Sequence, residues 1–157
     1  MSDPHAPQIA SDIASHLPQA QRDLTKVVQR HSLCPDPRET AALALHTAIV
    51  AVSSAQNLDN STRLSVARHV LQYWAEAIGD DDIAWFFGNR LAQYDTALRE
   101  PTHPVHVRAT HVLFDMMEPP ESVRGAPATT LGLLVMQYCG VFADRLARAH
   151  DRAPASA

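Results

Sequence analysis

The chain has 157 residues, of which 46% are hydrophobic and 19% charged, and its formal net charge is −4. A chain of this length supports one domain with a core that needs neither disulfides nor a structural metal. The net negative charge, without any stripe of lysine and arginine, excludes the electrostatic pattern typical of nucleic-acid binding. Cys34 and Cys139 have no CxxC context, and the first residues lack the basic and apolar regions of a signal peptide. We therefore expect a cytoplasmic protein.

Signals for helices recur along the chain, and glycine is scarce, with 5 residues. We predict a disordered N-terminus at 1–6, one helical bundle domain at 7–150, and a disordered tail at 151–157. The first helical segment covers about 7–32. Pro18 should break it into two pieces, because an interior proline removes a backbone hydrogen bond.

The second helix is predicted to begin after Asp36. Asp36 is a suitable N-cap, Pro37 occupies the first helical position, and Glu39 follows three residues after the cap, which is the pattern of a capping box. The stretch from Thr40 to Leu58 carries no charged side chain. Its several polar residues favour a buried helix over a membrane span.

Two further helices follow at about 61–78 and 83–98. The first should bury a stripe of apolar residues and end at Gly79, a residue suited to a C-terminal cap. That stripe comprises Leu64, Ala67, Leu71, Trp74 and Ile78. The second helix should bury its own stripe, which comprises Ile83, Phe87, Leu91, Tyr94 and Leu98.

A fifth helix is predicted from about Pro104 to Pro119, and a long sixth helix covers about 127–149. The sixth helix is apolar on nearly every side up to Phe142, so it either forms the centre of the bundle or lends one face to a homodimer. The predicted fold is therefore all-α, a single compact bundle of five to seven helices with the second and the last long helix at its centre.

Three histidines and an aspartate lie close together around the fifth helix: His103 at its predicted N-cap, and His106, His111 and Asp115 within it. Helical geometry places His106 about 140° around the helix from His111, too far for one ion to bind both. We therefore predict no metal and no cofactor. His111 and Asp115, with Arg108 beside them, remain either a weak acid–base site or a solvated polar pair. His46 and His69 are interpreted as structural histidines.

Trp85 lies on the predicted outer side of its helix, about 160° from Phe87. Asn89 shares this side, and Phe86 borders it. An outward tryptophan beside small and polar residues is typical of an interface anchor. The alternative is that a second helix covers this side as part of the core.

The functional hypothesis is a non-enzymatic protein-interaction module: an adaptor, an inhibitor, an immunity-type protein or a regulatory protein. It would bind a partner through an apolar and aromatic helical surface that includes Trp85, Phe86 and Asn89. We expect a protein partner and a possible homo-oligomer, but neither nucleic acid nor membrane as a partner. The alternative is a small helical enzyme or ligand-binding protein that uses His111 and Asp115 with Arg108.

Overall fold

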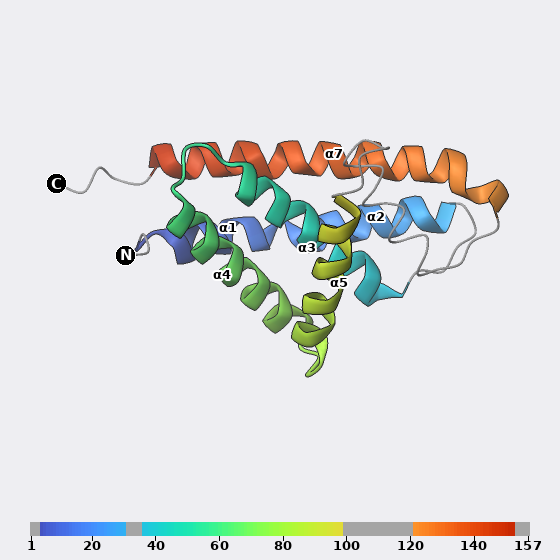
Figure 1. Cartoon of the computed structure of the whole chain (residues 1–157), viewed down its shortest axis with the longest axis horizontal. Coiled ribbons are helices and arrows are strands. Elements are labelled where there is room, and N and C mark those ends of the chain that lie inside the picture. The colour runs from blue at the N-terminus through green and yellow to red at the C-terminus, as the bar shows by residue number, and fades with distance from the viewer. Residues whose placement is uncertain (1–3, 31–35, 99–120, 153–157) are drawn as a thin grey trace.

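The computed structural model describes residues 4–30, 36–98 and 121–152, which form helices joined by short turns (Figure 1). The helices are α1 (Ala6–Ser15), α2 (Leu17–Arg30), α3 (Pro37–Ser54), α4 (Asn60–Ile78), α5 (Ile83–Leu98) and α7 (Glu121–Arg152). No β-strand occurs in these three ranges, and the helices pack against one another as one bundle. The predicted all-α bundle is confirmed. The helix predicted near 104–119 lies outside the described residues.

Helix α3 is at the centre of the bundle, as predicted. It contacts α2, α4, α5 and α7, which surround it in Figure 1. Every residue from Glu39 to Ala48 is buried. This segment consists largely of alanine and leucine and carries no charge after Glu39, so it can be covered on all sides without leaving an unpaired charge in the core.

The start of α3 differs from the predicted capping box in one respect. The Asp36 carboxylate accepts a hydrogen bond from the backbone N–H of Arg38 at 2.9 Å, and Pro37 begins the helix as predicted. Glu39 does not reach back to the cap. Its carboxylate instead accepts hydrogen bonds from Arg90 of α5. A hydrogen-bonded ion pair with arginine is stronger than a hydrogen bond to a neutral backbone N–H, which explains why the Glu39 carboxylate binds Arg90 and not the N-cap.

Helices α1 and α2 correspond to the first predicted segment. A turn at His16, whose backbone stays in the right-handed α region (φ −93°, ψ −10°), separates the two helices, and Pro18 is the second residue of α2, where a helix tolerates proline. The predicted break is therefore confirmed.

Helices α4 and α5 form a hairpin that reaches away from α7 (Figure 1). Gly79 caps α4 with φ +74°, and its N–H donates to the Ala75 carbonyl at 3.0 Å, as expected for a left-handed C-terminal cap.

The predicted core stripe of α4 is wrong at Leu64, which is 55% exposed. The buried positions repeat every four residues, at Thr62, Val66, Val70 and Trp74. This repeat follows the line of contact with α1 and α3.

Helix α7 runs along the bundle against α1, α2 and α3 (Figure 1). Its inner side is buried at Leu131, Val135, Phe142 and Leu146. Its outer side exposes three large apolar side chains: Leu133, Met136 and Val141. Between Leu131 and Leu146, the bundle thus covers α7 on one side only. Within the three described ranges, no helix combines the length and hydropathy needed to cross a membrane.

Candidate functional site

Helix α5 turns one side to the core and the opposite side to solvent. Ile83, Phe87 and Tyr94 are buried, whereas Trp85, the third residue of the helix, is 75% exposed. Exposed residues continue along this outer side toward the end of the helix. We call this surface the Trp85 face. It comprises Asp81, Asp82, Trp85, Gly88, Asn89 and Ala92, all of them exposed.

Small residues surround the indole on the Trp85 face. A side chain added at Gly88 would meet no atom within 4 Å, so the space beside this residue is open. The Asn89 side chain stays close to the helix, where its amide donates to the Trp85 carbonyl at 3.4 Å. The tryptophan side chain therefore stands beside uncovered helix backbone, with room for another group next to it.

Phe86 lies beneath this surface and not on it. Only 9% of the residue is exposed. The guanidinium groups of Arg38 and Arg90 lie over its ring, at 4.9 and 4.7 Å from the ring centroid. A cation over the face of an aromatic ring is attracted to it. Of the three residues predicted to bind a partner, Trp85 and Asn89 are accessible, and Phe86 supports the helix from below.

The ion pair between Arg90 and Glu39 joins α5 to the start of α3. Arg90 donates to the Glu39 carboxylate from Nε at 2.8 Å and from Nη2 at 2.7 Å. The Glu39 side chain is 8% exposed and the Arg90 side chain 19%. The hydrogen bonds to Glu39 raise the pKa of Arg90. A fork-to-fork contact of this kind fixes the orientation of both side chains, and so holds the base of the Trp85 face in place.

Arg38 is paired in the same region. Its guanidinium lies 3.2 Å from the Asp36 carboxylate. Burial raises the pKa of Asp36, but hydrogen bonds from the backbone and side chain of Arg38 outweigh it and hold this pKa below its ordinary value. Both arginines next to Phe86 therefore already have carboxylate partners.

Sequence reasoning missed the ion pair between Glu39 and Arg90 because its members are far apart in the chain. Glu39 and Arg90 are 51 residues apart, and no local spacing relates them. The same is true of Tyr138 on α7, whose hydroxyl donates to the Asp23 carboxylate on α2, 115 residues away. Burial and the bond to Asp23 raise the pKa of Tyr138 to about 12. This contact attaches α7 to the bundle.

His46 and His69, which the sequence predicts to be structural histidines, both pack within the helical bundle. His46 is buried, and its ring stacks on Tyr94 with 4.7 Å between centroids. The Tyr94 hydroxyl has no hydrogen-bond partner within the described part of the chain. His69 is half-buried, with Nδ1 at 2.7 Å from the Ser65 carbonyl. These contacts are those of packed side chains.

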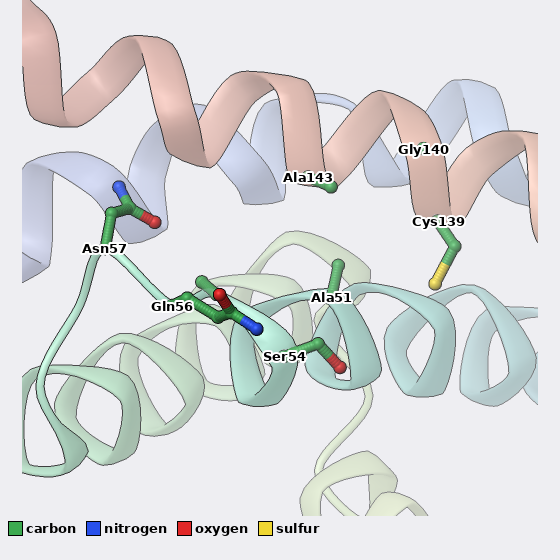
Figure 2. Close-up of a pocket in the computed structure, with 8 residues that line it drawn as sticks. Ala51, Ser54, Gln56, Asn57, Cys139, Gly140 and Ala143 are labelled. Carbon is green, nitrogen blue, oxygen red and sulfur yellow. The ribbon is translucent and has the colours of Figure 1, made fainter.

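A groove of about 450 Å³ lies between the end of α3 and α7 (Figure 2). Its lining is mostly small side chains, with Gln56 and Asn57 toward one end and Cys139 at the other. The Ser54 hydroxyl donates to the Val50 carbonyl at 2.8 Å. The Cys139 thiol contacts the Thr47 carbonyl at 3.6 Å, and burial raises its pKa. The groove therefore contains no hydroxyl or thiol activated as a nucleophile.

The residues of the enzymatic alternative, Arg108, His111 and Asp115, lie outside the described residues, as do His103 and His106. The parts of the chain that the structure describes contain no group of three or more histidine, cysteine, aspartate or glutamate residues placed to hold a metal ion.

Comparison of the chain with protein-family models, with curated proteins and with solved structures finds no match.

Proposed function

We propose that the chain is a non-enzymatic protein-interaction module that binds a partner through the Trp85 face. The observation that carries this proposal is the 75% exposure of Trp85 on an ordered helix. Tryptophan is enriched among the few interface residues that supply most of the binding energy, because it buries a large apolar area and also carries a hydrogen-bond donor.

The support beneath Trp85 favours binding. Phe87 and Tyr94 anchor α5 in the core, and the pair between Arg90 and Glu39 fixes it to α3. A partner would therefore bind Trp85 on a helix whose backbone is already held in place. Binding to a preorganised surface loses less conformational entropy than binding to a mobile loop.

The first prediction tests this surface by site-specific photocrosslinking. A benzophenone amino acid replaces Trp85 in one variant and Leu64 in a control variant, since Leu64 is also large, apolar and exposed, but lies on α4. In the cells that produce the chain, we expect a discrete crosslinked protein only from position 85. Trp85→Ala should weaken binding of that protein by about 2 kcal/mol, or about thirtyfold in Kd. Equal crosslinking from both positions, or none from position 85, rejects the proposal.

We also propose that the outer side of α7 joins two copies of the chain. Leu133, Met136 and Val141 are exposed along consecutive turns. Gly140, which also lines the groove between α3 and α7, is exposed, and a Cβ added there would meet no atom outside its own stretch of helix within 4 Å, so a second helix has room to approach the backbone. Exposed apolar side chains gathered on one helix face favour association.

The second prediction concerns the mass of the chain in solution. Sedimentation at increasing protein concentration should show a rising average mass for the wild type. A variant with Leu133→Lys and Met136→Lys should remain a monomer, because two charges would be buried on association. Leu64→Lys, the control on α4, should behave as the wild type. A wild type that stays monomeric at every concentration contradicts self-association through α7.

A further inference from the structure

The Trp85 face carries a negative charge from two exposed carboxylates, Asp81 and Asp82. Asp80, Asp81 and Asp82 come immediately before α5 and are exposed. The Asp80 side chain accepts the backbone N–H of Asp82 at 3.3 Å. The carboxylates of Asp81 and Asp82 make no hydrogen bond or ion pair to any residue that the structure describes. Asp82 lies three residues before Trp85, a spacing that puts both on the same side of the helix start.

Two arginines that the structure describes next to α5 are already paired. Arg38 pairs with Asp36, and Arg90 pairs with Glu39, both on the Phe86 side of α5. The Trp85 face itself contains no lysine, arginine or histidine. Its net charge is therefore negative, next to a large and exposed aromatic ring.

A stabilising role at the helix start explains only part of this charge. Carboxylates at a helix N-terminus interact favourably with the helix dipole. That effect accounts for acidic residues at this position, but it does not account for an exposed tryptophan one turn further along the same side. The aromatic ring and the carboxylates together form a surface that a cation would fit.

We infer that the partner of the Trp85 face is a protein segment that presents arginine or lysine side chains; this inference rests on the proposed interaction function. A guanidinium group stacks on the face of an indole and is attracted by its quadrupole. The aliphatic part of the same side chain can lie in the open space at Gly88. Asp81 and Asp82 then supply the opposite charge at the start of the helix.

The test uses the full-length chain and two blocked peptides in low-salt buffer. One peptide has three arginines separated by glycines. The other carries citrulline, a neutral group of nearly the same shape, at the same positions. Binding is followed by tryptophan fluorescence, because Trp85 is exposed whereas Trp74 is buried and donates to the Ala41 carbonyl. We expect the arginine peptide to bind at least about tenfold more tightly than the citrulline peptide, and binding to weaken as salt is raised.

Variants place the effect on this surface. Replacing Asp81 and Asp82 with asparagine should weaken binding of the arginine peptide about threefold to tenfold, and Trp85→Phe should remove the fluorescence response. The matched control is the double variant Asp12→Asn and Asp144→Asn, which changes the net charge by the same amount on α1 and α7. It should bind the arginine peptide as tightly as the wild type does. Equal affinity for both peptides overturns the inference. Equal weakening by the control pair also overturns it.

The two proposals fail in different ways. If the start of α5 unfolds when Asp81 and Asp82 are replaced, circular dichroism will show it, and the comparison of the two peptides on the wild type still decides the question. A specific crosslink at position 85 without preference for arginine retains the interaction function and rejects the cationic partner. Preference for arginine without any crosslink at position 85 rejects the interaction function.

Discussion

We expect Arg90→Met to destabilise the chain by about 3 kcal/mol, more than any substitution of an exposed ion pair. The variant leaves the Glu39 carboxylate, only 8% exposed, without the hydrogen bonds that Nε and Nη2 of Arg90 donate to it. Removing one partner of a buried ion pair costs about 3–5 kcal/mol, because the remaining charge is desolvated and uncompensated. The lower end of this range applies here, since the Arg90 side chain is 19% exposed and water can approach. The Phe86 ring also loses one of its two cation contacts.

The two members of this pair should not be equivalent. In Glu39→Met, the arginine can swing toward solvent and recover its hydration, so this variant should lose less stability than Arg90→Met. The double variant removes both charges and should lie within about 1 kcal/mol of the wild type, because apolar residues of similar size often replace a buried pair without loss. The large coupling energy between the two sites is the expected result of the double-mutant cycle.

Urea unfolding followed by circular dichroism measures all three variants. Arg148→Met is the control, because Arg148 pairs with Asp144 at 3.1 Å on the exposed surface of α7. Such i,i+4 surface pairs contribute about 0.3–0.5 kcal/mol. If Arg90→Met is no more destabilising than this control, the pair between Arg90 and Glu39 does not hold α5 in place, and the support proposed for Trp85 is wrong.

The sequence determines the helices well because their start and stop signals are local. Asp36 with Pro37, Gly79, and the break near Pro18 each act within one turn of the chain. The outward direction of Trp85 also follows from local spacing once the buried stripe with Phe87 is identified. These parts of the fold and of the candidate site are therefore predictable from sequence alone.

Contacts between helices are not predictable in the same way. The capping pattern assigned Glu39 to its own helix start, whereas packing of α5 against α3 brings a stronger partner to it. Leu64 fits an apolar stripe on α4, but the contact with α1 and α3 selects a different line of residues. Phe86 borders the outer side by helical angle, yet two arginines cover it. In each case the outcome depends on which residues of another helix come near, and local spacing carries no information on that.

Acid should destabilise the chain through His46, and the pH range follows from its pKa. Burial lowers the pKa of His46 from 6.5 to about 4, although Asp95 acts in the opposite direction. Above about pH 7.5 the histidine is neutral in both the folded and the unfolded chain, so it causes no dependence on pH there. As the pH falls from 6.5 to 4, the unfolded chain binds a proton that the folded chain does not, and the free energy of unfolding decreases.

The expected loss is about 2–3 kcal/mol between about pH 7.5 and pH 4.5, since each unit of pKa difference corresponds to about 1.4 kcal/mol. Carboxylates act in a different range. The pKa values of Asp36 and Asp59 lie below 3.8, so the stability that these groups contribute is lost only as the pH falls below that value. The loss between pH 6.5 and pH 4.5 can therefore be attributed to His46 without interference from these two groups.

His46→Phe isolates the effect. Phenylalanine keeps a flat ring against Tyr94, where the centroids are 4.7 Å apart, and removes the titrating group. The free energy of unfolding of this variant, measured with urea at a series of pH values, should be nearly constant from pH 6.5 to pH 4.5, while that of the wild type falls. Parallel pH profiles for the two proteins would show that His46 takes up its proton as readily in the folded chain as in the unfolded one. Burial of His46 between α3 and α5 would then be incorrect, and with it the packing that sets the orientation of α5 and Trp85.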